Sequence, residues 1–473
     1  MKLNTHFMES RISEHLPSFL RKMQKEALNK NTIDTFVSYY RKVAEHNSGL
    51  IYEKDIAPVE PEKITHLKDL QFYAQAGKKV LKHCVMIILN GGLGTSLGLT
   101  GPKSLIKVKN GKTFLELKLE NARNAGTKAV LMNSFRTHEK TLEALKHMGI
   151  KNSSEIPLCF LQHKFPKIFQ KTLAPAVWEK DPSLEWNPAG HGDIYQALFT
   201  SNMIHHLLDH GIRYAFISNC DNLGAVIDES LLGYFSQKGF PFLMEVTQRR
   251  PLDAKGGHLA RNKEGKLLLR EIAQCPQDEL KAFQDITKYR FFNTNNLWID
   301  LVFLKEYMSK YQNLRLPLIL KPARLDPRNN KSPGIFQIET AMGSAISLFE
   351  GASAVEVPKA RYIPVKGHND LLAVCSDCFV LKENEGIIEN PSRKDMAPIK
   401  ISLDPEYFKN IDMFFERFRH GVPSLVQCES LTVRGNVFFE KDIKIRGRVR
   451  IENTQNTPAV ISKGTVINYN MTI

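Results

Sequence analysis

The sequence predicts an α/β protein in which a central region alternates strands with helices. From about residue 81 to 380, short apolar runs alternate with helical patterns, which is typical of a largely parallel sheet covered by helices. Before this region, apolar residues at helical spacing predict helices. After it, short alternating runs punctuated by glycine predict a small parallel β-helix or β-roll. The 473 residues are also too many for one core. We therefore expect three units: 1–80, 81–380 and 381–473.

The first unit is expected to be a helical segment that carries no chemistry. A second helix is predicted from about residue 33 to 43, and prolines near residue 60 mark a linker. The first predicted helix has an apolar stripe formed by Ile12, Leu16, Leu20 and Met23. We expect this stripe to pack against the larger region.

Several apolar runs of the central region end in polar residues. The runs 129–132, 158–161 and 214–218 read as strands. Ligands of such sheets bind outside the carboxyl ends of the strands, so these polar ends are candidate site positions. Residues 242–272 look different, because two strands around the turn at 262–266 predict an antiparallel insertion.

The most distinctive stretch covers residues 85–104, VMIILNGGLGTSLGLTGPKS. An apolar run predicts a buried strand, and a loop with five glycines in eleven positions comes directly after it. Glycines let backbone N–H groups approach phosphate oxygens, and Lys103 adds a positive charge at the end of the loop. The loop is not a Walker motif, because a proline separates the last glycine from Lys103. Its glycines are also spaced too widely for the dinucleotide fingerprint.

The loop leads into a predicted strand at 105–108, an Asn-Gly turn and a helix capped by Thr113. The order of strand, glycine-rich loop, Pro-Lys, strand, turn and helix resembles the sugar nucleotidyltransferases. The string LNGGLGTSLG…GPKS is similar in particular to the UTP–glucose-1-phosphate uridylyltransferase (UDP-glucose pyrophosphorylase) family. The resemblance covers about residues 85–373 and, more loosely, the rest of the chain. Thr100 departs from it, since relatives often have a basic residue there, and phosphate affinity is expected to be weaker.

This resemblance implies a Rossmann-like nucleotidyltransferase (GT-A-like) mixed sheet, with an N-terminal helical segment and a C-terminal β-helix-like domain. In relatives the C-terminal domain can mediate self-association, so a homo-oligomer is a possible partner state. The implied reaction joins UTP and glucose 1-phosphate to give UDP-glucose and pyrophosphate. A sugar phosphate oxygen attacks the α-phosphorus of UTP in line, which mainly requires positioning and charge neutralisation.

The catalytic groups implied by the resemblance are two lysines and one carboxylate. Lys103 is expected to clamp the β- and γ-phosphates, and Lys366 to act near the α-phosphate. The residues after Lys366 depart from the family, which often has Thr or Ser there, so the side-chain contacts of that loop stay open. Asp221 comes just after a buried strand, where a carboxylate is explained by binding Mg²⁺.

Other residues are assigned to the two substrates. Gln162 resembles the glutamine that contacts uracil, since an amide offers both a donor and an acceptor. The expected nucleotide-binding residues are Leu89, Asn90, Gly91, Gly92, Gly94, Gln162, Gly190 and Asp221. The expected substrate-binding residues are His191, Asn219, Lys255, Glu271, Asn293 and Asn295. Asp193 is interpreted as the N-cap of the helix that begins after it, and a zinc site on His191 and Asp193 is disfavoured because further ligands are missing.

Composition and charge limit the classes of molecule that we expect the protein to bind. The net charge of +15 comes from 65 Lys and Arg scattered among 50 acids, which favours steering of phosphate substrates over nucleic acid as the main partner. Four basic residues at 444, 446, 448 and 450 are interpreted as one solvated face of a strand. No signal peptide or run of about 20 apolar residues is seen, so no membrane partner is expected.

Cysteine usage favours a reducing compartment. The seven cysteines have no dense spacing, and we expect a cytoplasmic protein. The lone CxxC of Cys375 and Cys378 is interpreted as two small apolar residues.

Several alternatives to the uridylyltransferase remain. They are a broader UDP-sugar or N-acetylhexosamine pyrophosphorylase, a non-catalytic UDP-sugar binding protein and, on charge alone, an RNA-binding protein. The presence of Lys103, Asp221 and Lys366 together argues against the non-catalytic alternative.

Overall fold

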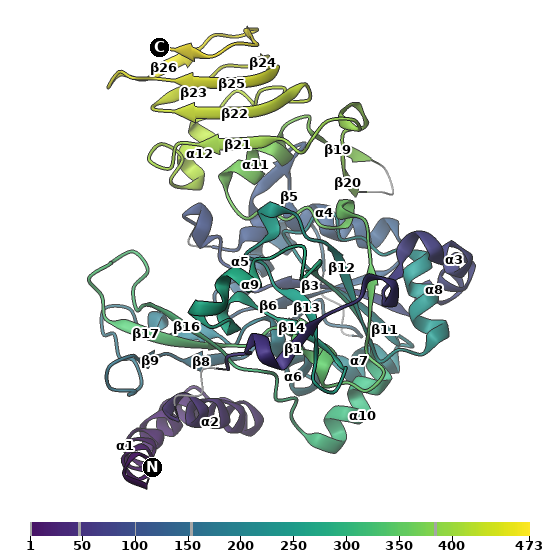
Figure 1. Cartoon of the computed structure of the whole chain (residues 1–473), viewed down its shortest axis with the longest axis vertical. Helices are drawn as coiled ribbons and strands as arrows, with labels where there is room; N and C mark the ends of the chain where they lie inside the picture. Colours follow the sequence, from purple (N-terminus) through teal and green to yellow (C-terminus); the bar gives the residue numbers. More distant parts are fainter. Residues whose placement is uncertain (1, 46–48, 100, 152–154, 383–385) are drawn as a thin grey trace.

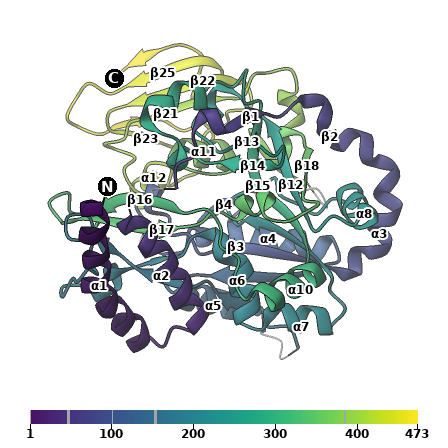
Figure 2. The same cartoon turned by 60° about the horizontal axis from the view of Figure 1, so that its bottom comes forward.

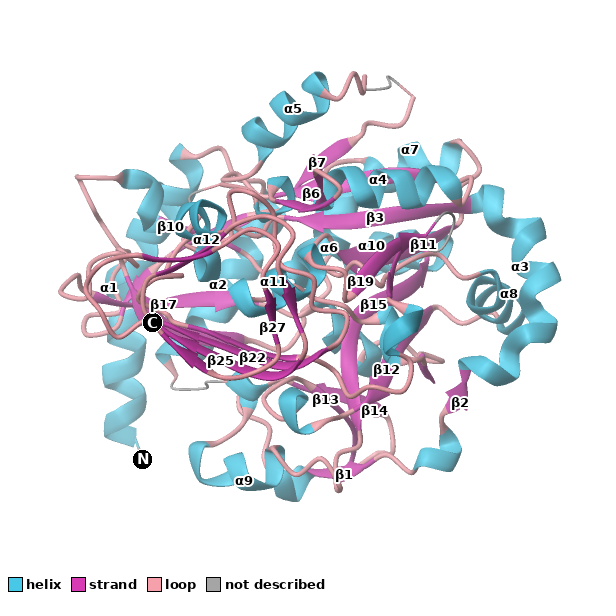
Figure 3. Cartoon of the chain, turned by 90° about the horizontal axis from the view of Figure 1, so that it is seen from above, coloured by secondary structure: helices cyan, strands magenta, loops and turns pink. Residues whose placement is uncertain are grey.

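The computed structural model describes residues 2–45, 49–99, 101–151, 155–382 and 386–473 (Figure 1). A large mixed sheet forms the centre, with helices on both of its faces (Figure 3). The N-terminal helices lie at one end of the molecule, and the C-terminal strands stack at the other. Position 100, where the sequence departs from relatives, lies outside the described residues.

The central sheet has the order β2-β18-β12-β15-β11-β3-β6-β7. Strand β3 (Cys84–Asn90) pairs in parallel with β11 (Tyr214–Asn219) and β6 (Lys128–Asn133), and β6 pairs in parallel with β7 (Cys159–Leu161). These strands confirm the three predicted apolar runs and the buried strand before the glycine-rich loop.

The central sheet is largely parallel, as expected, except around one strand in its other half. Strand β15 (Phe291–Asp300) runs antiparallel to both β11 and β12 (Phe242–Gln248). Beyond β12, β18 (Ser353–Glu356) and β2 (Thr65–His66) are parallel again. The sheet is therefore mixed, which agrees with the fold class that the family resemblance implies.

The antiparallel insertion is confirmed. Strands β13 (His258–Asn262) and β14 (Leu267–Arg270) form a hairpin, and β13 also pairs with β15 at His258 and Phe292. Strand β1 (Ile56–Pro58) adds to its outer edge. The division into three units stays a prediction, and two short strands of the first segment, β1 and β2, belong to the central sheet.

Two apolar cores cover the faces of the sheet. Met86 and Ile88 of β3 point to one face, and Val85 and Ile87 point to the other. Because successive side chains of a strand alternate, a strand buried on both faces must be apolar throughout, as β3 is until its last residue. The helices of the described chain are α1 (Lys2–Lys25), α2 (Lys30–Ala44), α3 (Ala74–Val80), α4 (Phe114–Asn124), α5 (His138–His147), α6 (Ile194–Thr200), α7 (Met203–Asp209), α8 (Glu229–Lys238), α9 (Leu280–Phe283), α10 (Leu301–Tyr311), α11 (His368–Cys375) and α12 (Ile411–Arg417).

The N-terminal helices α1 and α2 pack on a separate small sheet (Figure 2). This sheet joins β9 (Ile168–Phe169), β17 (Gly334–Glu339) and β16 (Ile319–Arg324). Phe19 and Phe36 are fully buried between the helices and residues such as Ile338 of β17. A hairpin of β8 (Lys164–Pro166) and β10 (Trp186–Pro188) lies beside it. Leu16 and Met23 of the predicted stripe pack in this core, as expected, whereas Leu20 is not part of it and the side chain of Ile12 lies outside what the structure describes.

The C-terminal strands form a β-helix-like stack, as predicted (Figure 1). One ladder joins β21 (Lys400–Leu403), β22 (Cys428–Arg434), β25 (Gly447–Glu452) and β28 (Met471–Thr472) in parallel. Two further parallel pairs are β23 (Val437–Phe439) with β26 (Ala459–Ile461), and β24 (Lys444–Ile445) with β27 (Val466–Ile467). The remaining short pairs are β4 (Lys107–Lys109) with β5 (Lys112–Thr113), and β19 (Phe379–Lys382) with β20 (Gly386–Glu389).

Two local predictions near these strands have different outcomes. Thr113 caps α4 in a capping box with Glu116, as expected. The four basic residues from 444 to 450 do not share one strand, because β24 ends at Ile445 and β25 begins at Gly447. Their side chains are exposed, and Arg448 and Arg450 pair with glutamates.

Candidate active site

The carboxyl ends of β3, β11 and β7 meet around one cavity of about 580 Å³. Because these strands are parallel, the polar residues after each of them lie at the same edge of the sheet. Most of the residues predicted to bind the nucleotide line this cavity, namely Leu89, Asn90, Gly91, Gly92, Gln162, Gly190 and Asp221. Lys103 lines it as well, together with two residues predicted to bind the sugar phosphate, His191 and Asn219.

The glycine-rich loop folds back so that its end lies beside its beginning. The Lys103 backbone N–H donates to the Gly92 carbonyl at 3.3 Å, and the Gly94 N–H donates to Gly101 at 3.4 Å. A Cβ on Gly91 would lie 2.4 Å from Oε1 of Gln162, so a side chain there would displace this amide, whereas a Cβ on Gly92 would meet no atom within 4 Å. Gly94 is buried against Leu99 and supports the loop from outside the cavity lining.

Lys103 and Asp221 contact each other directly at the cavity wall. Nζ of Lys103 donates to Oδ2 of Asp221 at 2.5 Å, and the two side chains are only 15% and 22% exposed. Such a charge-assisted contact is strong, yet both groups still line the cavity. A phosphate ligand and a cation could therefore exchange partners with this pair.

The turn at Gly190 depends on its glycine. Gly190 has φ of +88°, and a Cβ there would lie 2.6 Å from the carbonyl oxygen of Thr340. The next residue, His191, accepts at Nδ1 a hydrogen bond from the Met342 N–H at 3.2 Å, and burial lowers its pKa to about 4. The neutral ring therefore carries its proton on Nε2, which can donate to an anion.

Asp193 precedes α6 directly, but its side chain does not cap the helix as the sequence suggested. Its carboxylate accepts from the His163 backbone N–H at 2.6 Å and from Nδ1 of His163 at 2.9 Å, and it makes no capping bond to α6. Burial alone would lower the pKa of His163, but the Asp193 carboxylate raises it. This pair ties the residue after Gln162 to the turn that carries His191.

A second group of predicted residues lies on the insertion side. Strand β15 carries a bulge, because Glu245 pairs with Asn296 while the next residue of β12 pairs with Asn293. Asn295 takes φ of +57°, which asparagine tolerates, and Nδ2 of Asn293 donates to Oδ1 of Asn295 at 2.9 Å. The bulge brings these two amides together, with Asn293 buried and Asn295 partly exposed.

Glu271 and Lys366 lie close to this bulge. The N–H of Asn293 donates to the Gly257 carbonyl, and Gly257 packs directly against the Glu271 carboxylate. Burial raises the pKa of Glu271 to about 7, although the charge of Lys366 opposes this shift. Lys366 also lies over the ring of Phe292 at 5.9 Å. The side chain of Lys255 is exposed and lies outside the cavity lining.

The two groups are joined by the segment 361–365, which runs alongside the loop after β11. The Leu223 N–H donates to Ile363 at 3.2 Å, and the Val365 N–H donates to the Asp221 carbonyl at 3.3 Å. Lys366 comes directly after this segment. Lys103, Asp221 and backbone amides therefore line the cavity, whereas Lys366, Glu271 and the two asparagines lie outside its lining. Lys366 is connected to the cavity through the bonds between segment 361–365 and the Asp221 loop.

Comparison with known proteins assigns this site to a family. The family model described as UTP–glucose-1-phosphate uridylyltransferase matches residues 33–446. The chain belongs to this family. Relatives named UTP–glucose-1-phosphate uridylyltransferase include one from Solanum tuberosum, 37% identical over 82% of this chain and 81% of the relative, and one from Saccharomyces cerevisiae, 34% identical over 97% and 88%.

Solved structures agree with this assignment. A mutant UDP-glucose pyrophosphorylase from Leishmania major, in complex with UDP-glucose, is 39% identical, with a TM-score of 0.88 and coverage of 97% of this chain and 98% of that chain. A protein from Trypanosoma brucei described as UDP-glucose phosphorylase is 39% identical, with a TM-score of 0.86 and coverage of 97% and 100%. The uridylyltransferase fold of the family therefore extends along almost the whole chain.

Several lining residues of this uridylyltransferase fold were missed by the sequence analysis. The wall of the cavity also carries the cations Arg136, Lys167, Lys321 and Arg324. Lys167 is 4% exposed, and burial lowers its pKa to about 8. The only signal in the sequence was position, since Arg136 comes three residues after the end of β6. A cationic wall of this kind helps to draw phosphate substrates into the cavity.

Proposed function

We propose that the protein transfers the uridylyl group of UTP to glucose 1-phosphate, releasing pyrophosphate and forming UDP-glucose. The observation that carries this proposal is the meeting, at one edge of the sheet, of the glycine-rich loop with Lys103, Asp221 and the Lys366 segment. The names of the relatives and the complex of the Leishmania major protein with UDP-glucose support it.

The nucleotide would lie along the glycine-rich loop. Gln162 would pair with the uracil edge, Gly91 and Gly92 would let the base and ribose approach the backbone, and Gly190 would border the base. Leu89, Asn90 and Gly94 shape this pocket. Lys103 would bind the β- and γ-phosphates.

The sugar phosphate would occupy the insertion side. Nε2–H of His191 would donate to its phosphate, while Asn219, Glu271, Asn293 and Asn295 would bind the hydroxyl groups. Lys255 would reach the phosphate from the exposed loop. A phosphate oxygen forms the new bond to the α-phosphorus, and the bond from that phosphorus to the bridging oxygen of pyrophosphate breaks. Lys366 would stabilise the charge that develops during this exchange.

Asp221 is the residue that would hold Mg²⁺. The ion commonly binds one or two carboxylates and takes its other ligands from water and substrate phosphates. Asp221 is a partly exposed carboxylate at the cavity wall, which also carries Glu339, and one or two carboxylates fit that pattern. The described part of the chain contains no cluster of three or more His, Cys, Asp or Glu residues that could hold a metal ion. When bound, Mg²⁺ would neutralise triphosphate charge.

The surroundings in which the enzyme works are also part of the proposal. All seven cysteines are free, which supports a reducing compartment, and we place the protein in the cytoplasm. Within the described residues, no helix combines the length and the apolar character needed to cross a membrane. Self-association would use the C-terminal β-helix, which exposes Val460, Val466 and Tyr469.

The direct test is pyrophosphate release from UTP with a panel of sugar 1-phosphates. We expect glucose 1-phosphate to give the highest kcat/KM among glucose, galactose and N-acetylglucosamine 1-phosphates. Preference for the N-acetylated sugar would favour the broader pyrophosphorylase. Binding of UDP-glucose without any pyrophosphate release would favour a non-catalytic protein.

The pH dependence of sugar binding tests the role of Glu271. A carboxylate accepts hydroxyl hydrogen bonds at both oxygens, whereas its protonated form loses part of this capacity. Because the pKa of Glu271 is raised to about 7, most of the group is protonated at pH 6. We expect the KM for glucose 1-phosphate to rise about tenfold from pH 8 to pH 6. Glu271→Gln serves as the control for titration of the substrate itself. An equal rise in KM in that variant would contradict the role.

A further inference from the structure

We propose that Glu245 is a positioning residue that ties the sugar-binding bulge of β15 to the segment carrying Lys366. This inference deepens the proposed function and rests on it. Glu245 lies on β12, makes no part of the cavity lining, and is fully buried.

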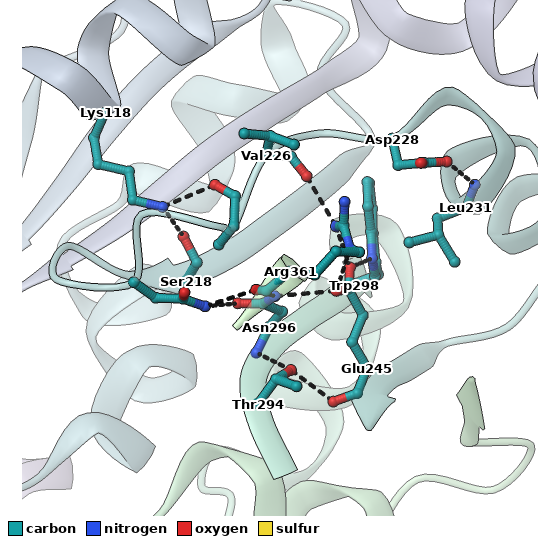
Figure 4. Close-up of polar contacts among 12 residues, drawn as sticks. Lys118, Ser218, Val226, Asp228, Leu231, Glu245, Thr294, Asn296, Trp298 and Arg361 are labelled. Atoms are coloured by element: carbon teal, nitrogen blue, oxygen red, sulfur yellow. Dashed lines mark hydrogen bonds and ion pairs between the residues drawn. The ribbon is translucent and has the colours of Figure 1, made fainter. Parts of the chain in front are cut away.

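Glu245 holds the bulge of β15 through three residues that come after Asn293 (Figure 4). Oγ1 of Thr294 donates to the Glu245 backbone carbonyl at 2.7 Å. Nδ2 of Asn296 donates to Oε2 at 3.0 Å, and Nε1 of Trp298 donates to Oε1 at 2.9 Å. The residues on either side of Asn295, Thr294 and Asn296, are therefore both hydrogen-bonded to Glu245.

The same carboxylate holds Arg361, the first residue of the segment that leads to Lys366. Nε of Arg361 donates to Oε2 at 2.8 Å and Nη2 donates to Oε1 at 2.7 Å, so the pair is bidentate. Nη2 also donates to the Val226 carbonyl at 2.9 Å, which fixes the other side of the guanidinium group (Figure 4). Both oxygens of Glu245 are thus shared between the sugar side and the lysine side.

Asn222 completes the connection to the Asp221 loop. Its Nδ2 donates to the Arg361 carbonyl at 3.1 Å and to Oδ1 of Asn296 at 3.0 Å, and its Oδ1 accepts from the Ile363 N–H at 2.8 Å. Asn222 is 1% exposed and lies next to Asp221 in the chain. The segment 361–365 is therefore held between the Asp221 loop and Glu245. These bonds fix the position of the backbone from which the Lys366 side chain extends.

A buried ion pair at this place needs an explanation other than stability. Removing two charges from water is costly, and an apolar pair of similar volume is often equally stable or more stable. Other charged groups act on the pair, since the fully buried Lys118 interacts electrostatically with both Glu245 and Arg361, and Asp228 interacts with Arg361. Directional hydrogen bonds give such a network a defined geometry that apolar packing does not give.

Loss of the Glu245 hydrogen bonds is expected to lower kcat. A displacement of about 1 Å in a catalytic group can cost about 10²-fold in rate. Loss of the Glu245 bonds should let the Lys366 segment and the β15 bulge shift relative to each other. UTP, which would bind mainly to the glycine-rich loop, should be affected far less.

Two substitutions test this, with one control. Glu245→Gln keeps the shape and removes the charge, and the paired change Glu245→Met with Arg361→Met replaces the ion pair by apolar side chains. Arg393→Met is the control, because Arg393 is a buried arginine (1% exposed) that bonds to backbone carbonyls at the C-terminal β-helix. We expect kcat to fall about 10- to 100-fold in both Glu245 variants. The KM for UTP should stay within about twofold of the parent value, and the control should keep the parent kcat.

The outcomes separate the positioning role from a merely structural one. Folded Glu245 variants with parent kcat would overturn the proposal, as would a rise in the KM for UTP with kcat unchanged. A control that loses as much kcat for the same fall in Tm would also overturn it. So would failure of the paired variant to fold, because the ion pair would then be needed for folding itself. If the parent enzyme released no pyrophosphate, the proposed function would fail instead.

Discussion

Lys366→Ala is expected to lower kcat by about 10²–10³ while the protein stays folded, because it removes one group that stabilises charge in the transition state. Lys366 comes after a segment that is bonded to the Asp221 loop, and its charge opposes the rise in the pKa of Glu271, so it lies near residues that we assign to both substrates. The fold should tolerate the change, since the hydrogen bonds of segment 361–365 to the Asp221 loop use backbone atoms and Asn222. Steady-state kinetics with UTP and glucose 1-phosphate, together with Tm, measure both effects.

A lysine far from the site provides the comparison. Lys441→Ala changes an exposed lysine of the C-terminal β-helix and should leave kcat unchanged. Near-normal turnover in Lys366→Ala would remove this lysine from the mechanism. A similar loss in Lys441→Ala would show that the effect is not specific to the site.

Lys103→Ala is expected to lower kcat/KM for UTP by about 10²–10³. The reason is twofold: the triphosphate loses its cation, and Asp221 loses the partner that it holds at 2.5 Å. Lys103→Arg should keep only part of the parent kcat/KM, because the planar guanidinium group of arginine does not replace a compact ammonium group between a carboxylate and a phosphate. Initial rates at varied UTP measure the ratio. A Lys103→Arg rate equal to that of the parent would count against the clamp.

Much of this arrangement could be predicted from the sequence, for a physical reason. An apolar run that leads at once into polar residues identifies both a buried strand and its exposed end. Parallel strands then bring those ends together without any knowledge of side-chain contacts. Gln162, Asn219 and Asp221 were found in this way, and the glycine-rich loop was found from its unusual density of glycine.

The rest depends on partners that are far apart in the sequence. Asp193 looked like a helix cap because capping is a local interaction, but its carboxylate is engaged by His163, 30 residues earlier. The reversed direction of β15 is fixed by its pairing with β11 and β12, which no local pattern shows.

Buried charge was the least predictable feature. Glu245 and Arg361 are separated by 116 residues, and no sequence pattern near either residue predicts that they form an ion pair. The same holds for Lys167, which reads as an ordinary lysine of a polar segment and is in fact buried at the cavity wall. Such residues become visible only when the chain is folded.

Calorimetric titration of Gly92→Val with UTP in the presence of magnesium tests most directly whether the cavity beside the glycine-rich loop holds the nucleotide. A Cβ at position 92 meets no protein atom within 4 Å, so the variant should keep the parent Tm, while its side chain occupies cavity space. We predict one UTP per parent chain and binding that is about 10- to 100-fold weaker in the variant. Unchanged UTP affinity in the folded variant would contradict this placement of the nucleotide.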